Sequence, residues 1–229
     1  VIDYSDSKLL DIPSDIYWWK VGKKSKDEDS KDLSSVLLFD LSNNRLEEWP
    51  KNEFFFRADK IQVMKLDYNL LTTLPSGLSD CRDLVYLSIS QNKLNGNSIL
   101  GKETPLTHLK KLIYLDLSGN EIEEWPFQNS FQNIPTLEIV KLNNNNLNMI
   151  PGPECLSSFL KLKTLDLSNN DIIALGSDHG IGLLTSLEVL NLSSNILESL
   201  PEDLGCIGSH LLTLNLSNNN LRWLPNTIE

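Results

Sequence analysis

The chain has 229 residues, of which 40% are apolar, and its formal net charge at pH 7 is −11. This length suits one elongated domain with a substantial core, and a negative charge of this size disfavours nucleic acid and anionic membrane surfaces as partners. No stretch approaches the roughly 18 consecutive apolar residues that a membrane span requires, so we expect no membrane insertion.

One eleven-position pattern, L-x-x-L-x-L-x-x-N-x-L with conservative replacements, recurs along the chain. A partial repeat at 1–13 is followed by an insertion at 14–35 and by eight repeats over 36–229. The asparagines at position 9 of the eight copies are 25, 23, 28, 25, 25, 25 and 24 residues apart, which suits stacked coils of roughly 20 to 29 residues. The eight copies of the pattern occupy 36–46, 61–71, 84–94, 112–122, 137–147, 162–172, 187–197 and 211–221.

Each position of the pattern has a predicted physical role. Alternation places the leucines of positions 4 and 6, such as Leu115 and Leu117, on the inner side of a short strand. Positions 3, 5 and 7 face outward, and strands that all run in one direction form a parallel sheet. The asparagine at position 9, such as Asn145, is expected to be buried and to bond backbone groups of neighbouring coils.

Most copies close on an apolar residue followed by proline, which suits an extended stretch outside the sheet. Trp49 and Trp125 occupy a slot that leucine or isoleucine fills in other copies, so we expect both to be buried. Trp223 is shifted by one position and is expected to be exposed.

The insertion at 14–35 holds three adjacent aromatic residues, Tyr17, Trp18 and Trp19, before a run of mixed charge. Tryptophan and tyrosine dominate binding hot spots, so Trp18 and Trp19 are candidate partner anchors. The alternative is that they pack on the outer side of the coils.

These repeats resemble the leucine-rich repeat superfamily across nearly the whole chain. The endings LLTTLP, LESLP and LRWLP are similar to those of the intracellular repeats of Ras-pathway scaffolds and Roco-type kinases. The resemblance implies an α/β fold, a curved solenoid or horseshoe with a parallel sheet on its concave face and loops or short helices on its convex face. It also implies that the concave face binds other proteins.

Cysteine usage indicates a reducing environment. Cys81, Cys155 and Cys206 lie far apart at unrelated positions of the repeat, which is not a disulfide framework, so an intracellular, cytoplasmic location is expected. The N-x-S sequences at Asn191 and Asn215 lie inside the repeated phrase N-L-S and are interpreted as by-products of the repeat. Because the chain begins in mid-repeat and no polar cap is recognisable at either end, we expect it to be a segment of a longer protein.

The sequence offers no catalytic constellation. Cys206 and His210 are four residues apart, but two metal ligands without a further pair are a weak signal. The short Gly180-Ile181-Gly182 sequence lacks the rest of a phosphate-binding loop. We therefore expect no enzyme activity, metal, cofactor or small-molecule substrate in this chain.

The residues that the repeat leaves free, on the concave face, are the candidate binding site. Position 3 is apolar in the first five copies and has two tyrosines at its middle, although such residues are also simply good strand formers. Position 5 carries charges that alternate in sign two repeats apart, which would set the register of a partner. The apolar candidates are Leu38, Val63, Tyr86, Tyr114 and Ile139, with Val85 and Ile113 beside them, and the charged candidates are Lys65, Asp116, Lys141 and Asp166.

Three functions fit this sequence. The leading hypothesis is a non-enzymatic scaffold or adaptor that binds a protein partner inside the cell. The second is the regulatory arm of a multidomain kinase, phosphatase or GTPase whose active site lies elsewhere. The third is a structural subunit of a large stable assembly.

Overall fold

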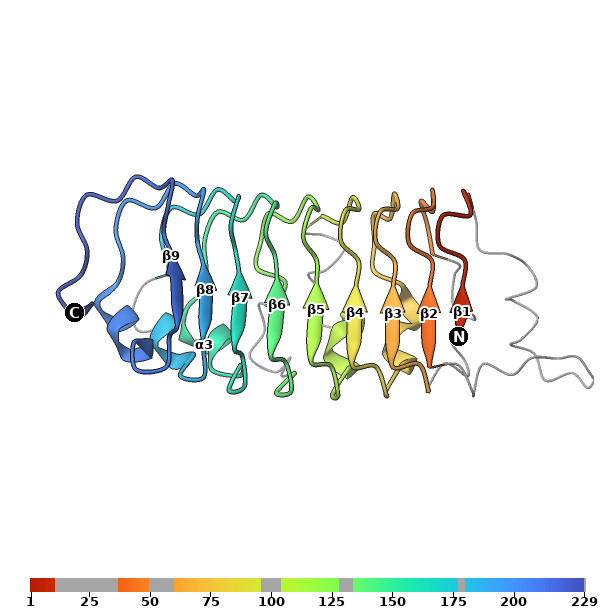
Figure 1. Cartoon of the computed structure of the whole chain (residues 1–229), viewed down its shortest axis with the longest axis horizontal. Coiled ribbons are helices and arrows are strands. Elements are labelled where there is room, and N and C mark those ends of the chain that lie inside the picture. Colours follow the sequence, from red (N-terminus) through yellow and green to blue (C-terminus); the bar gives the residue numbers. More distant parts are fainter. Residues whose placement is uncertain (11–36, 50–59, 96–103, 128–133, 177–179, 229) are drawn as a thin grey trace, which may run out of the picture.

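The computed structural model describes residues 1–10, 37–49, 60–95, 104–127, 134–176 and 180–228 (Figure 1). In these ranges nine strands form a single parallel sheet in which every strand pairs with its neighbours in the sequence. The coils stack side by side, and the N- and C-terminal coils lie at opposite ends of the stack (Figure 1). The strands are β1 (Ile2–Asp3), β2 (Leu38–Asp40), β3 (Val63–Lys65), β4 (Tyr86–Ser88), β5 (Tyr114–Asp116), β6 (Ile139–Lys141), β7 (Thr164–Asp166), β8 (Val189–Asn191) and β9 (Thr213–Asn215).

The sheet confirms the predicted solenoid, and a further strand, β1, lies at its N-terminal edge. Strand β1 pairs with β2 so that Ile2 lies beside Phe39, a position 4 residue. From β2 to β9 each position of the pattern aligns with the same position in the next copy, as Tyr86 does with Tyr114. Residues at equivalent positions of successive copies therefore lie side by side in the sheet.

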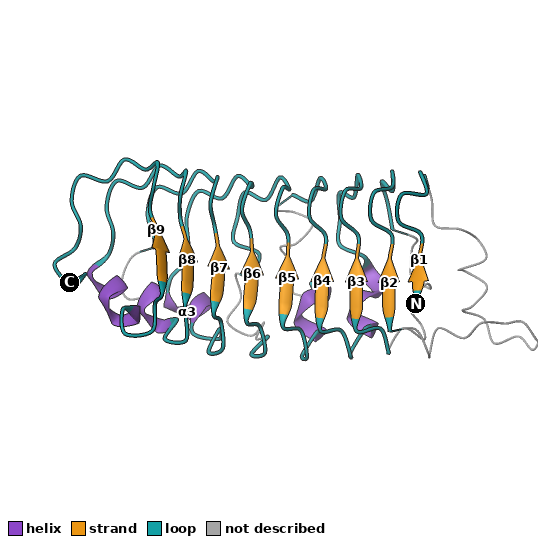
Figure 2. Ribbon diagram, in the orientation of Figure 1, coloured by secondary structure: helices purple, strands orange, loops and turns teal. Residues whose placement is uncertain are grey.

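Short helices lie behind the sheet, on the convex side (Figure 2). Two of them begin at a proline, Pro105 and Pro153, where the missing N–H leaves no helical bond unmade. Their lengths vary because each coil has only to return to the start of the next strand. They are the 3₁₀ helices η2 (Ser76–Asp80), η3 (Pro105–His108), η4 (Ile181–Leu183) and η5 (Glu202–Ile207), and the α-helix α3 (Pro153–Leu156).

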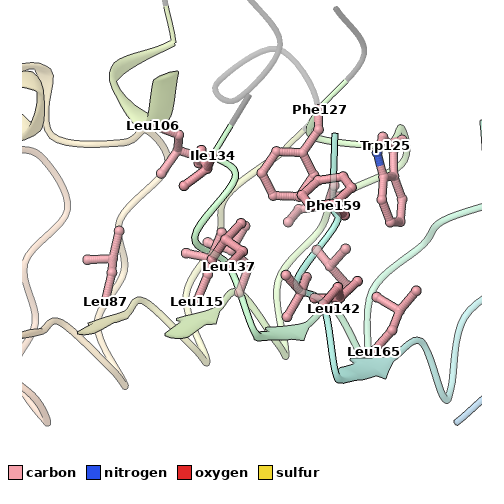
Figure 3. Close-up of a cluster of buried hydrophobic side chains, with 14 of the residues drawn as sticks. Leu87, Leu106, Leu115, Trp125, Phe127, Ile134, Leu137, Leu142, Phe159 and Leu165 are labelled. Atoms are coloured by element: carbon pink, nitrogen blue, oxygen red, sulfur yellow. The ribbon is translucent and has the colours of Figure 1, made fainter. Parts of the chain in front are cut away.

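The space between sheet and convex side is filled by the leucines of the pattern. Leu115 and Leu117 have no exposed surface, as predicted. Trp125 is also buried and packs edge to face against Phe127 and Phe159, with ring centroids 5.8 and 6.5 Å away (Figure 3). The predictions for the other two tryptophans are confirmed as well, since Trp49 is buried and Trp223 is 61% exposed.

The position 9 asparagines form a ladder at the ends of the strands, and all are buried except Asn219, which is half-buried. Asn145 Nδ2 donates to the carbonyl oxygens of Leu117 at 3.0 Å, Leu142 at 3.0 Å and Asn143 at 3.4 Å. Its Oδ1 accepts from the backbone N–H of Ile122 at 3.1 Å. One amide thus joins its own coil to the preceding coil, which confirms the predicted role. Equivalent bonds are made by Asn44, Asn69, Asn92, Asn120, Asn170, Asn195 and Asn219.

Just before each ladder asparagine, the residue at position 8 has a positive φ. The chain turns sharply out of the strand here, and only glycine and asparagine visit this left-handed region readily. Most copies supply one of these two residues, but the third strand is followed by Tyr68, with φ 54°. The position 8 residues, with φ between 53° and 64°, are Asn43, Tyr68, Gln91, Gly119, Asn144, Asn169, Ser194 and Asn218.

Candidate protein-binding surface

The outward face of the sheet, called the concave face below, carries positions 3, 5 and 7 of every repeat. Its central feature is the column of position 3 residues, which the parallel register places side by side from β2 to β9. The N-terminal half of this column is apolar and its side chains are half-buried. That half consists of Leu38, Val63, Tyr86, Tyr114 and Ile139, and the column continues as Thr164, Val189 and Thr213.

Tyr86 and Tyr114 form a stacked pair at the middle of the apolar half. Their ring centroids are 4.2 Å apart and their planes differ by 5°. Lys141 Nζ lies 5.5 Å from the centroid of the Tyr114 ring, within cation–π range. The sequence placed both tyrosines on neighbouring strands, and the structure shows that they hold each other in one orientation.

Tyr114 is also tethered to the strand that carries it. Its hydroxyl donates a hydrogen bond of 3.0 Å to Asp116 Oδ2. Burial of the ring, and then the negative charge of Asp116, raise the pKa of Tyr114 far above its ordinary value. The hydroxyl therefore stays protonated and remains a donor in the physiological range.

The charges at position 5 pair between neighbouring strands. Lys65 Nζ lies 3.6 Å from Asp40 Oδ2, and Lys141 Nζ lies 3.8 Å from Asp116 Oδ2. The expectation that opposite charges alternate two repeats apart was wrong, because the 25-residue step puts each lysine directly beside the aspartate of the preceding strand. Asp166 is half-buried on β7 and accepts hydrogen bonds from Ser168 through Oδ1.

Exposed apolar side chains flank the tyrosine pair. Ile113 is 39% exposed and Val85 is half-buried, next to Tyr114 and Tyr86 in the chain. Tyr68, which sequence reasoning missed, is 58% exposed. The signal that could have found Tyr68 is a bulky aromatic residue at position 8, where most repeats have asparagine or glycine.

The C-terminal half of the concave face is polar. Threonines replace the tyrosines at position 3, and position 2 carries an ion pair in which Lys163 Nζ lies 2.8 Å from Glu138 Oε2. This hydrogen bond raises the pKa of Lys163. The concave face therefore has two chemically distinct halves.

Other predicted features can be located only in part. Trp18, Trp19 and the insertion at 14–35 lie outside the described residues. Among the residues that are described, no three histidine, cysteine, aspartate or glutamate side chains are placed to hold a metal ion. No helix in the described ranges is long and apolar enough to cross a membrane. Cys81 and Cys155 are buried, and Cys206 is exposed.

Comparison with known proteins identifies the repeats. A family model described as Leucine Rich Repeat matches residues 111–134, 161–183, 186–207 and 210–229. Tsukushi of Gallus gallus is 33% identical over 147 residues, which cover 63% of this chain and 34% of that protein. The transforming growth factor beta activator LRRC33 of Danio rerio is 29% identical over 118 residues, which cover 51% of this chain and 17% of that protein. The chain thus spans about a third or less of the length of these two relatives.

A solved structure gives the same picture. The leucine-rich repeat ectodomain of the plant membrane receptor kinase GASSHO1/SCHENGEN3 from Arabidopsis thaliana, in complex with Casparian strip integrity factor 2, has a TM-score of 0.66 and 31% identity. The match covers 82% of this chain and 22% of that one.

These relatives correct the expected location. Tsukushi, LRRC33 and further matched relatives such as lumican are secreted, matrix or membrane proteins, so the expectation of a cytoplasmic protein was wrong. It rested on scattered cysteines, and a buried cysteine such as Cys81 can stay reduced in any compartment because the fold shields it from oxidants.

Proposed function

The chain belongs to the leucine-rich repeat superfamily. From this premise we propose that it is a non-enzymatic module that binds a protein partner through the apolar, N-terminal half of the position 3 column. The similarity to leucine-rich repeat proteins such as Tsukushi and lumican supports a role in protein–protein interaction. The proposed contact surface is the N-terminal half of the concave face, centred on Tyr86 and Tyr114. Val85, Ile113 and Tyr68 would enlarge it.

The observation that carries this proposal is the stacked tyrosine pair. Aromatic anchors contribute most to binding when they are already held in the bound orientation, because little side-chain entropy is then lost on association. Tyr86 and Tyr114 meet this condition through their mutual stacking and through the hydrogen bond from Tyr114 to Asp116. Neither ring is fully buried, so each keeps apolar surface for a partner to cover.

The ion pairs beside the column favour one register of the partner over others. Asp40 with Lys65, and Asp116 with Lys141, place fixed charges of both signs along position 5. The lysine side chains of both pairs are 39% exposed and the aspartate side chains are largely buried. The exposed lysines add little affinity, but the pairs penalise a partner that brings like charges opposite them. Selectivity is therefore assigned to position 5 and affinity to position 3.

A pair of matched variants tests the proposal. Tyr86→Glu with Tyr114→Glu places two charges in the apolar half, whereas Thr164→Glu with Thr213→Glu places them at the same pattern position in the polar half. We expect quantitative mass spectrometry after affinity capture from source tissue, extracellular material included, to lose a set of partners by at least about tenfold with the first variant only. Circular dichroism spectra of both variants serve as the control that they are folded.

A milder variant guards against local damage near Asp116. Tyr86→Ser with Tyr114→Ser removes the aromatic surface without adding charge, and it should lose the same partners. If both tyrosine variants retained every partner of the wild-type chain, the site would not be this half of the concave face.

A second candidate is the sensing arm of a larger receptor or enzyme. The specific observation that favours it is the 31% identity to a receptor-kinase ectodomain, of which this chain matches 22%. The sequence of the full-length transcript tests it directly. A kinase, phosphatase or GTPase domain in the same polypeptide would support the hypothesis of a sensing arm. Its absence would favour the hypothesis of an independent binding module.

A further inference from the structure

Two neighbouring strands, β8 and β9, end at position 5 on asparagine, where β2, β5 and β7 end on aspartate. Asn191 and Asn215 are each followed by leucine and serine, which gives the N-x-S acceptor sequence twice. We propose that this pair is an N-glycosylation site and that its oligosaccharide covers the polar half of the concave face. The proposal does not depend on the proposed function.

The amide nitrogens at these two positions are available in the folded protein. Asn191 Oδ1 accepts from Ser193 N at 3.2 Å and Ser193 Oγ at 2.8 Å, and Asn215 Oδ1 accepts from Ser217 in the same way. Neither Nδ2 donates a hydrogen bond to any described residue. The ladder asparagine Asn195 differs, because its Nδ2 donates to three carbonyl oxygens and is buried.

The repeat pattern separates structural from modifiable asparagines. Position 9 is followed two residues later by leucine or isoleucine, so no ladder asparagine can be part of an acceptor sequence. Position 5 is followed two residues later by serine in most copies, so an asparagine there creates one automatically. An amide that the fold requires is thereby protected from modification.

The fold does not require asparagine at position 5. Asp166 Oδ1 accepts from Ser168 N at 3.0 Å and from Ser168 Oγ at 2.7 Å, as Asn191 Oδ1 does from Ser193. Asp116 accepts the same two bonds from Ser118. The serine hydrogen bonds alone therefore do not account for asparagine at these two positions.

The modification is a group transfer from a lipid-linked oligosaccharide diphosphate. A bond forms between asparagine Nδ2 and the anomeric carbon of the sugar, while the bond from that carbon to the diphosphate oxygen breaks. Nδ2 loses one proton, the lipid diphosphate leaves, and no electron is transferred to or from another molecule. The secretory pathway supplies this donor, and the secreted, matrix and membrane relatives are consistent with passage through it.

The positions of the two acceptors limit what the sugar covers. Asn191 and Asn215 are register partners on adjacent strands, which lie about 4.8 Å apart. An oligosaccharide on either residue would therefore extend from the same end of the sheet. Tyr114 lies three strands before Asn191, roughly 14 Å away along the sheet, so neither acceptor lies beside the tyrosine pair.

Peptide mapping of the natural full-length protein tests the proposal. The protein is isolated from its source and treated with peptide N-glycosidase F in ¹⁸O-water, which converts glycosylated asparagine to labelled aspartate. We expect the label at Asn191, at Asn215 or at both. Unmodified asparagine at both positions would overturn the proposal.

Variants of the same full-length protein, secreted from cultured cells, assign the site. Asn191→Asp with Asn215→Asp keeps the serine hydrogen bonds and should abolish the gel shift caused by the glycosidase. Asp166→Asn keeps them too and creates a third acceptor sequence, so it should add glycan at position 166 in the double variant. A glycosidase shift that the double variant retained in full would place the sugar elsewhere and overturn the assignment.

Discussion

A single amide at position 9 replaces several backbone bonds that a longer strand would otherwise make. Strands in this sheet have three residues or fewer, so the backbone groups just beyond each strand need other partners. Asn145 supplies them for its own coil and for the coil before it. The asparagine is therefore as much part of the core as the leucines.

Replacing Asn145 by alanine should destabilise the protein by about 1 to 3 kcal/mol, because buried carbonyl oxygens and the N–H of Ile122 lose their partner. Urea unfolding followed by circular dichroism measures the loss. Asn146→Ala, at the exposed next position, is the matched control and should change the free energy of unfolding by less than about 0.5 kcal/mol. Equal effects of the two variants would contradict the ladder.

Tyr68 adopts a backbone conformation that a bulky side chain tolerates poorly, with φ 54°. Asparagine fills the same position in four other repeats. We expect Tyr68→Asn to stabilise the fold by about 1 kcal/mol through relief of this strain, and to weaken partner binding if Tyr68 extends the tyrosine surface. Thermal unfolding and quantitative capture measure the two effects. A variant that lost stability would show that the Tyr68 ring contributes more to packing than the strain costs.

Individual strands in this fold have no stability of their own. Strands of three residues are stable only because neighbours cover both edges and leucines fill the space behind. Strand β7 shows this clearly, since it is paired with β6 and β8 and Leu165 has no exposed surface. Damage to one strand should therefore spread to the strands beside it.

Leu165→Asp places an unpaired charge in the continuous core and should cost more than about 3 kcal/mol. Because β7 links its neighbours, we expect hydrogen exchange to show lost protection in β6, β7 and β8 together. Thr164→Asp, one residue away on the concave face, is the control and should preserve protection in all three strands. Loss confined to β7 would show that neighbouring coils are less coupled than the shared core implies.

At the scale of the whole molecule, most of the fold could be predicted from the sequence because the same residue types recur at the same positions of every repeat. The burial of Leu115, Asn145 and Trp125 and the register of nine strands followed from the pattern. The stacking of Tyr86 on Tyr114 and the tether to Asp116 did not, because they depend on side-chain orientations that spacing does not fix. The pairing of the position 5 charges was also misjudged. Opposite charges were expected to alternate two repeats apart, but the side chains that meet in a parallel sheet come from neighbouring strands, which are one repeat apart.

The location was misjudged because it was inferred from one residue type, the cysteines. Scattered cysteines exclude a disulfide framework, but they do not exclude an extracellular protein whose coils are held together by leucines and amides. Cys81 and Cys155 are buried and act as small apolar side chains. A repeat protein that already has a continuous apolar core does not need disulfide bonds for stability.

The order of strands also determines how the molecule responds to force. Strands pair only with their sequence neighbours, and the first and last coils lie at opposite ends of the stack (Figure 1). Tension applied through the two ends would therefore act along the interstrand hydrogen bonds. These bonds would break strand by strand and not all at once. We expect such a chain to lengthen under tension in small steps of about one coil each.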